Sequence, residues 1–347
     1  MLRHSIVAPG IKGDDDPDLI AIPSFPIPFG QGFRWPLSSA LATRRLMRLQ
    51  PQLIEAGDPY QFAWSPLRAR DKLNSQAIAF YHSDLPQLAA HRFGLIGQRA
   101  AENYLRRLYT TFDLVLAPSR ASCDKLKSLG IAQVRHQPLG VDTEVFAPEH
   151  RDRFLRRRLG LRDDSRLLVY AGRFSREKNL QALMDAVALL GKPYHLLLIG
   201  AEVPPPRSGE LTGQLSCLPY QRDAGVLASL MGGSDVFVHP GQHETFGLVV
   251  LEAMACGLPV LGIAGGGVAE LVDGDTGLLI DPGSSSALAE GIQTLFRSDL
   301  HAMGRCGRQK VITAYGWDCI MPQLIQHYER LLGSGWALPG EMASLPT

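Results

Sequence analysis

The chain has 347 residues, more than one ordinary hydrophobic core contains, so its length predicts two domains. Its 45% apolar and 20% charged residues are typical of a globular protein, and a net charge of +1 gives no overall field to attract nucleic acid. The five cysteines are scattered, without a paired or zinc-binding spacing, which favours the cytoplasm. No apolar run approaches the roughly 18 residues of a membrane span.

The first part of the chain alternates short apolar runs with helical patterns. Ser38 and Ser39 are candidate caps for a helix that runs to about residue 49. The pattern predicts another helix over 97–109 and one that begins at Ser119. Strands are expected at 5–10, 19–23, 62–64, 76–81 and 113–118. This alternation predicts a parallel sheet with helices on both faces.

A second α/β series follows a linker near residues 138–148. Its expected strands are 167–172, 194–200, 235–239, 260–263 and 277–280. The fold class predicted for the whole chain is therefore α/β, with two parallel-sheet domains.

The strand at 235–239 leads into the most informative segment of the chain. Glu244 follows that strand, and Glu252 lies two turns into a helix predicted over 248–255. Open α/β sheets place ligands at the carboxyl ends of their strands. The N–H groups of residues 247–249 would hold an anion at the start of this helix. An anion site between two carboxylates suits a nucleotide sugar, although an isolated pair of glutamates at this spacing is more often ordinary surface.

Two cations follow the first strand of the second series. Arg173 and Lys178 lie in the sequence Gly-Arg-Phe-Ser-Arg-Glu-Lys-Asn, at the end of the strand at 167–172. A planar guanidinium and a point charge can hold a diphosphate between them. The alternative is a solvated charged loop, which is the commoner place for such residues.

The segment Glu-x7-Glu followed by Ala-Met-Ala-Cys-Gly-Leu-Pro-Val resembles the donor-site signature of the retaining glycosyltransferases of family 4. The resemblance extends over most of the chain. It implies the GT-B fold, in which two Rossmann-like domains face each other across a cleft. It also implies that Arg173 and Lys178 hold the donor diphosphate, that Glu244 binds hydroxyls of the transferred sugar, and that Glu252 binds the ribose. The further donor-binding positions it implies are Phe246, Gly247, Leu248 and Val249.

The same resemblance suggests domain boundaries. Gly-Val-Asp-x-x-x-Phe at 140–146 is similar to the family's crossover between domains. We therefore expect an acceptor-side domain over 1–143 and a nucleotide-sugar domain over 144–317. A helix over 318–332 would cross back to the first domain, with Trp317 and Tyr328 as anchors, and 333–347 would be a tail.

His82 and Asp84 are the candidates on the acceptor side. Both follow the strand at 76–81, and the family has a histidine at a comparable place, near the transferred sugar. A partly buried histidine of no catalytic role is the alternative for His82. Further along, the Gly265–Gly267 run either lies beside the nucleotide or makes a tight turn.

Two basic helical segments belong to the first domain. One carries Arg44, Arg45 and Arg48, and the other carries Arg99, Arg106 and Arg107. Such helices can lie on an anionic membrane surface, but more often they are the charged edge of a core helix.

These observations predict a retaining, metal-independent glycosyltransferase without a cofactor. Its donor would be a UDP- or GDP-sugar. A lipid and a cell-envelope glycan are among the candidate acceptors. The expected location is the cytoplasm or the inner face of the membrane, with no nucleic-acid partner. The alternatives are a non-catalytic nucleotide-sugar-binding partner protein and a nucleotide-sugar epimerase of the same fold.

The beginning of the chain departs from the family pattern. Residues 5–10 resemble the second strand of family members, and no first strand with a Gly-rich loop precedes them. We therefore expect a shortened first domain, in which a central strand is lost and backbone groups are left unpaired.

Overall fold

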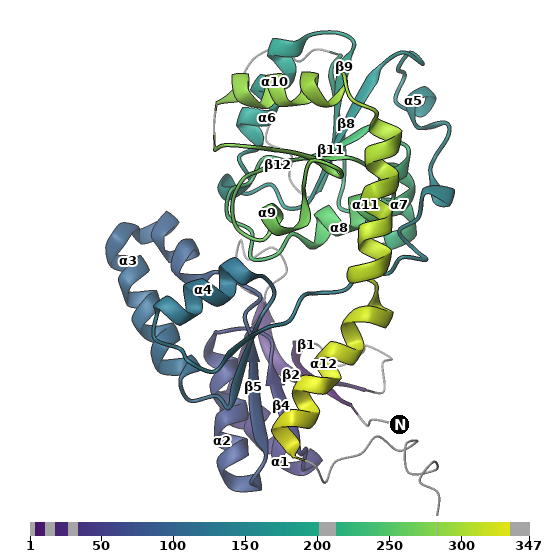
Figure 1. Cartoon of the computed structure of the whole chain (residues 1–347). Coiled ribbons are helices and arrows are strands. Elements are labelled where there is room, and N and C mark those ends of the chain that lie inside the picture. Colours follow the sequence, from purple (N-terminus) through teal and green to yellow (C-terminus); the bar gives the residue numbers. More distant parts are fainter. Residues whose placement is uncertain (1–3, 11–17, 27–33, 201–212, 283, 334–347) are drawn as a thin grey trace, which may run out of the picture. The chain divides into compact units, whose positions relative to one another are not determined.

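The computed structural model describes residues 4–10, 18–26, 34–200, 213–282 and 284–333. The chain divides into two compact units, each with its own core (Figure 1). Unit 1 comprises Met1–Ala117, Ser122–Gln137 and Gln323–Thr347, and unit 2 comprises Pro118–Ala121 and Pro138–Pro322. The sequence-based division at 143/144 and 317/318 stays a prediction. The expected tail lies, apart from Gly333, outside the described residues.

Unit 2 is built on a six-stranded sheet in which every paired strand is parallel. The strand order is β10-β9-β8-β11-β12-β13. The strands are β8 (Arg166–Ala171), β9 (Tyr194–Ile199), β10 (Leu215–Leu218), β11 (Val236–His239), β12 (Val260–Ile263) and β13 (Gly277–Ile280). The sequence analysis predicted all of these except β10, which is the edge strand and is only partly buried.

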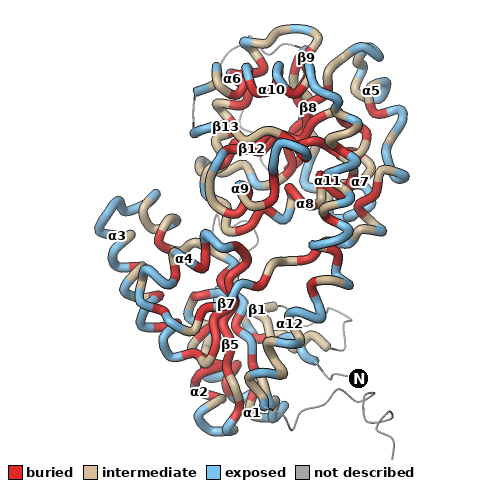
Figure 2. Tube along the Cα trace, in the orientation of Figure 1, coloured by how far each residue is buried: buried red, intermediate tan, exposed pale blue. Residues whose placement is uncertain are grey.

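Helices cover both faces of this sheet, because successive strand residues point to opposite sides. One core layer joins β8 and β9 to α6 (Leu180–Leu190) and α10 (Ser285–Leu295). The other joins the same strands to α7 (Ala224–Gly232), α8 (Leu248–Ala255), α9 (Val268–Leu271) and α11 (Leu300–Ala314). The sheet is therefore buried between two layers of helices, as Figure 2 shows. A short helix, α5 (Leu155–Arg158), adds Leu155 to the second layer.

The strand order fixes where unit 2 can bind a ligand. From β8 the chain winds outward through β9 to β10, and then it returns to place β11 on the other side of β8. The loops after β8 and β11 therefore leave the sheet in opposite directions, and the carboxyl ends of these strands form the kind of switch point at which α/β sheets bind ligands. Arg173, Lys178 and Glu244 all lie in those two loops.

Unit 1 contains two sheets. The first has three strands, β1 (Ile6–Gly10), β2 (Leu19–Pro26) and β3 (Arg34–Pro36), with β2 parallel to β1 and antiparallel to β3. The second is parallel, with β4 (Leu53–Ala56), β5 (Gln76–Phe80), β6 (Leu114–Ala117) and β7 (Val134–His136) in sequence order. No strand pairing joins the two sheets among the described residues. The expectation of a shortened first domain stays a prediction.

Besides the later residues of the last helix, the described part of unit 1 contains four α-helices. They are α1 (Ser39–Leu49), α2 (Trp64–Leu73), α3 (Leu85–Tyr109) and α4 (Arg120–Ser128). The Ser38 hydroxyl accepts a hydrogen bond from the N–H of Ala40, so α1 has the cap that its sequence predicts. The strand expected at 62–64 is wrong, because these residues form a 3₁₀ turn that leads into α2. The strand is β4 instead, whose short Leu-Ile-Glu-Ala sequence carries little periodic signal.

The last helix, α12 (Trp317–Leu332), belongs to both units. Its first residues cluster with unit 2, where the Trp317 ring packs against Gly140. Its later residues cluster with unit 1, where the Tyr328 hydroxyl donates to Glu55 at 2.7 Å. Among the described residues, none of the helices combines the length and apolar character that a membrane crossing requires.

Candidate functional site

Three charged or titratable side chains of unit 2 meet around one oxygen of Glu244. Lys178, in the 3₁₀ turn after β8, makes an ion pair with Glu244 Oε1. His239, the last residue of β11, lies 3.0 Å from the same oxygen through Nε2. The two loops that the strand order brings together thus meet in a single Lys-Glu-His contact.

The neighbours of Glu244 determine its charge. Burial by itself would raise the pKa of this carboxyl, but the hydrogen bond from His239 and the positive charge of Lys178 lower it to about 2. Glu244 is therefore an anion at neutral pH. An ionised carboxylate accepts hydrogen bonds and cannot donate one.

His239 is a member of this cluster that the sequence analysis missed. Its side chain is only 1% exposed, and its Nδ1 has no hydrogen-bond partner among the described residues. The proton therefore fits on Nε2, where it can be donated to Glu244. The signal in the sequence was a histidine at a strand end, followed by Pro240 and lying five residues before Glu244.

A free cation and free backbone donors lie near the same strand ends. The Arg173 side chain is exposed and has no hydrogen bond or ion pair in the described part of the chain. At the start of α8, the N–H groups of Leu248 and Val249 likewise have no acceptor there. Unpaired N–H groups at a helix N-terminus carry partial positive charge, so this end of α8 favours an anion.

Four predicted donor-binding positions lie at this helix start. Phe246 is buried in the core and faces Tyr315 at 6.2 Å between ring centroids, so only its backbone is available to a ligand. Gly247 is the N-cap of α8, while the Leu248 side chain is partly exposed. Val249 packs against the core from a partly buried position.

Glu252 lies on the second turn of α8 and has no side-chain partner among the described residues. Burial raises its pKa to about 7, because no positive group compensates for the lost hydration of the carboxylate. This position differs sharply from Glu244, although both residues are glutamates of the same segment. A partly buried carboxyl without a partner is suited to accept hydrogen bonds from ligand hydroxyls.

The Gly265–Gly267 run supports the Glu244 loop directly. The N–H of Gly267 donates to the Glu244 carbonyl at 2.8 Å. A Cβ on Gly266 would lie 2.5 Å from that carbonyl, and a Cβ on Gly267 would lie 2.4 Å from the Phe246 Cα. The glycines are therefore required for close approach of two backbones, whether or not they also touch a ligand.

The two acceptor-side candidates lie in unit 1, after β5. The His82 ring stacks on Phe80 with 4.2 Å between centroids, and the surrounding protein lowers the pKa of His82 by desolvation. Asp84 caps α3 by accepting a hydrogen bond from the N–H of Gln87, and it pairs with Lys125 at 2.5 Å. These contacts give Asp84 a structural role in placing α3.

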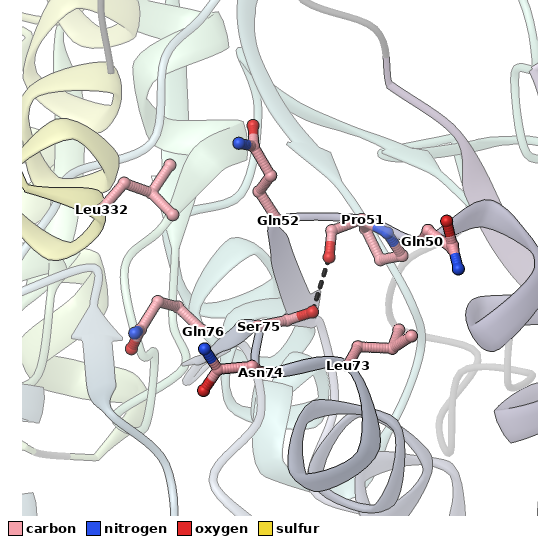
Figure 3. Close-up of a pocket in the computed structure, with 8 residues that line it drawn as sticks. All are labelled: Gln50, Pro51, Gln52, Leu73, Asn74, Ser75, Gln76 and Leu332. Atoms are coloured by element: carbon pink, nitrogen blue, oxygen red, sulfur yellow. Dashed lines mark hydrogen bonds between the residues drawn. The ribbon is translucent and has the colours of Figure 1, made fainter. Parts of the chain in front are cut away.

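Two cavities lie away from all of these residues. One, of about 430 Å³, is at the amino ends of β4 and β5, where the Ser75 hydroxyl donates to the Pro51 carbonyl (Figure 3). The other, of about 450 Å³, is at the amino ends of β11 and β12 and includes Asp235 and Pro259. Neither is at the carboxyl ends of the strands, where α/β sheets bind their ligands. Geometry and chemistry therefore favour the Glu244 cluster as the candidate site.

Comparisons with known proteins identify the family of this chain. The family model described as Glycosyltransferase Family 4 matches residues 2–145, and the model described as Glycosyl transferases group 1 matches residues 151–310. A GDP-mannose-dependent alpha-mannosyltransferase of Mycobacterium tuberculosis (strain CDC 1551 / Oshkosh) is 31% identical over 294 residues, which are 84% of this chain and 76% of the relative. A Mycolicibacterium smegmatis (strain ATCC 700084 / mc(2)155) protein of the same description is 32% identical, with 83% and 76% covered.

Solved structures show the same architecture. Sucrose-phosphate synthase from Thermosynechococcus elongatus aligns with a TM-score of 0.74 and 26% identity, covering 84% of this chain and 77% of that one. Anabaena Alr3699/HepE in complex with UDP-glucose aligns with a TM-score of 0.72 and 22% identity, covering 89% and 85%. The chain belongs to glycosyltransferase family 4 and is a glycosyltransferase of the GT-B fold. The resemblance, the fold class and the reaction class predicted from the sequence are confirmed.

Proposed function

We propose that this protein transfers a sugar from a nucleoside-diphosphate sugar to an acceptor hydroxyl, with retention of anomeric configuration and without a metal ion. The observation that carries the proposal is the Lys178–Glu244–His239 contact beside the free N-terminus of α8. A diphosphate would lie between Arg173, Lys178 and the N–H groups of Leu248 and Val249. This arrangement supplies positive charge where the leaving group becomes more negative.

Each carboxylate has a separate role in this proposal. Glu244, ionised at neutral pH, accepts hydrogen bonds from hydroxyls of the transferred sugar, while Glu252 accepts them from the ribose. The diphosphate competes with Glu244 for Lys178 and so frees a carboxylate oxygen for the sugar. The leaving phosphate oxygen then takes the acceptor proton on the face from which it departs. His82, with its lowered pKa, stays neutral near pH 7 on the acceptor side.

The acceptor in this proposal is a lipid or a cell-envelope glycan. Support comes from the relatives, which include a sulfoquinovosyl transferase SQD2 of Arabidopsis thaliana, 29% identical with 85% of this chain covered, and a phosphatidylinositol dimannoside mannosyltransferase of Mycobacterium tuberculosis (strain ATCC 25177 / H37Ra), 27% identical with 84% covered. A lipid acceptor requires the enzyme to work at a membrane surface. Peripheral contact with the inner face of the membrane is therefore part of the proposal.

The direct test is turnover of defined donors with and without acceptor. GDP-mannose is the first donor to try, followed by UDP-sugars, and the acceptors are phospholipid and glycolipid extracts. The proposal expects transfer only with acceptor, an α-configured product by NMR, and unchanged rates in excess EDTA. Conversion of the donor without acceptor would identify an epimerase. Tight donor binding without any turnover would identify a non-catalytic partner protein. A strict need for Mn²⁺ or Mg²⁺ would refute the metal-free mechanism.

The diphosphate role is tested by Arg173→Ala and Lys178→Ala. Charge on the leaving diphosphate grows in the transition state, so both variants should lower kcat by more than they weaken donor binding. Because charge-assisted hydrogen bonds contribute about 1.5–3 kcal/mol, the expected loss is about 10- to 100-fold each. Steady-state kinetics gives kcat and KM of each variant, and a separate binding measurement gives the donor Kd for comparison. A rise in KM with unchanged kcat would contradict the role.

A further inference from the structure

The most exposed large apolar side chains among the described residues are neighbours in the sequence. Ile96 is 84% exposed, Leu95 is 72% exposed and Phe93 is 67% exposed. Single exposed apolar residues are ordinary, but three within four positions on one helix form a patch that needs an explanation. All three belong to α3, which Figure 2 shows as a mixture of exposed, intermediate and buried stretches.

The three apolar residues lie at a kink in α3 that is centred on Gly94. Gly94 has φ 62° and ψ −155°, a conformation that favours glycine, and it divides α3 into two helical pieces. At Gly97 the chain packs so closely that a Cβ would lie 2.5 Å from the Phe93 Cβ. The buried residues of α3 are Pro86 at one end and Ala101, Leu105, Leu108 and Tyr109 at the other. Both ends of α3 therefore pack into unit 1, whereas residues 91–96 between them are all exposed.

The charge around the kink has one sign. Residues 85–101 contain no Asp or Glu, whereas Arg92 and Arg99 flank the three apolar side chains. The Arg92 guanidinium lies 5.9 Å from the centre of the Phe93 ring. The first acidic residue after the kink, Glu102, accepts a hydrogen bond from the Gln98 amide at 2.8 Å. An apolar tip with cations beside it is complementary to a bilayer that carries anionic headgroups.

We propose that Phe93, Leu95 and Ile96 form a wedge that inserts into the interfacial region of an anionic lipid bilayer, with Arg92 and Arg99 on its headgroups. A symmetric contact with a second copy would bring two patches of the same positive charge together, which is unfavourable. The wedge also lies on the helix that directly follows His82, the candidate residue on the acceptor side. α3 starts three residues after His82, and Gly94 is about 14 Å further along the helix.

The test is flotation with vesicles of equal parts phosphatidylglycerol and phosphatidylcholine, compared with pure phosphatidylcholine. The test variant combines Phe93→Ser, Leu95→Ser and Ile96→Ser. The matched control combines Phe154→Ser, Leu189→Ser and Tyr220→Ser, which removes three apolar side chains of unit 2 that are each about two-thirds exposed. Wild type and control should bind the anionic vesicles, and the wedge variant should bind at least about tenfold more weakly.

A second set of variants tests the charge and the insertion. Arg92→Gln with Arg99→Gln should weaken binding to anionic vesicles and reduce its dependence on salt. Phe93→Trp should add fluorescence that brominated lipids quench, relative to wild type. Equal vesicle binding by wild type and the wedge variant would overturn the proposal. So would a concentration-dependent oligomer that only the wedge variant loses, since the patch would then hold a second copy or a protein.

The inference rests on the proposed function only for its effect on activity, so the two can fail separately. With an acceptor in vesicles, the wedge variant should lose transfer, whereas its thermal shift with GDP or UDP should equal that of wild type. Vesicle binding without any transfer would leave the wedge intact and refute the proposed reaction. Transfer without any vesicle binding would refute the wedge and favour a soluble acceptor.

Discussion

At the scale of single residues, environment gives the two glutamates of one segment opposite properties. Lys178 and His239 lie beside Glu244 and lower the pKa of its carboxyl to about 2. At Glu252 burial is the only effect, and it raises the pKa of the carboxyl to about 7. The first is an anion at every physiological pH. The second is close to half-protonated at neutral pH, so its titration can be observed.

The titration of Glu252 predicts proton release on ligand binding. Ribose hydroxyls that donate to this carboxylate favour its ionised form, so binding should lower its pKa and release about half a proton at pH 7. Calorimetric titration of GDP and UDP in buffers of different ionisation enthalpy measures this number. Glu252→Gln is the control and should release less. Equal proton release by both proteins would remove Glu252 from the ribose site.

The same carboxyl makes stability depend on pH. Its pKa rises from 4.5 in the unfolded chain to about 7 in the folded one, so the folded state binds the proton more tightly between these values. Stability from this group is present at low pH and is lost as pH rises from about 4.5 to 7. Relative to Glu252→Gln, wild type should therefore become less stable across this range, by at most about 3 kcal/mol. Urea denaturation of both proteins at several pH values provides the comparison.

His239 is predicted to set the charge and direction of Glu244. In His239→Phe the carboxylate loses a hydrogen bond that lowers its pKa, so the acid limb of kcat/KM should move to higher pH. Because a hydrogen bond to a charged group is worth about 1.5–3 kcal/mol, kcat should fall about 10- to 100-fold. His239→Gln keeps a donor and should recover part of the loss. A uniform loss without a shifted pH profile would indicate only a packing role.

At the scale of elements, the site depends on loops held by their neighbours. Gly267 touches the backbone of Phe246, and its N–H holds the Glu244 carbonyl. Gly267→Ala would force these backbones apart, at a cost of about 1–3 kcal/mol. We expect a lower melting temperature and strongly reduced transfer. Gly274→Ala, where the added Cβ meets nothing within 4 Å, is the matched control and should change neither. Similar behaviour of the two variants would show that the glycine contact does not support the site.

At the scale of the whole molecule, unit 2 contains all the donor-side candidates. Hydrogen exchange with and without a nucleoside diphosphate should therefore give protection in residues 172–179 and 240–255, at the ends of β8 and β11. The N–H groups of Leu248 and Val249 should be among those that slow, because they gain an acceptor. Protection confined to unit 1 would place the nucleotide elsewhere.

Much of this protein was determined by local sequence. The buried strands of unit 2 are runs of apolar residues that end at Gly, Pro or His, and α8 is an apolar helix between Gly247 and Gly257, so both could be predicted. The residue types at the ends of those strands, with a cation after β8 and a carboxylate after β11, suggested a diphosphate-sugar site, and the resemblance to family 4 assigned the role of each residue, which stays a prediction.

Only the tertiary structure decided which of those residues meet. β3, β4, β7 and β10 were missed because short strands take their stability from pairing with distant partners, which sequence periodicity does not contain. The sheet brings β11 beside β8, so Glu244 in the loop after β11 meets Lys178, 66 positions away in the chain, and His239 at the end of β11 contacts the same carboxylate. The Phe93–Ile96 wedge likewise depends on which parts of α3 the rest of unit 1 covers. Periodicity reports the preferences of each segment, whereas burial and charge pairing depend on contacts between segments far apart in the chain.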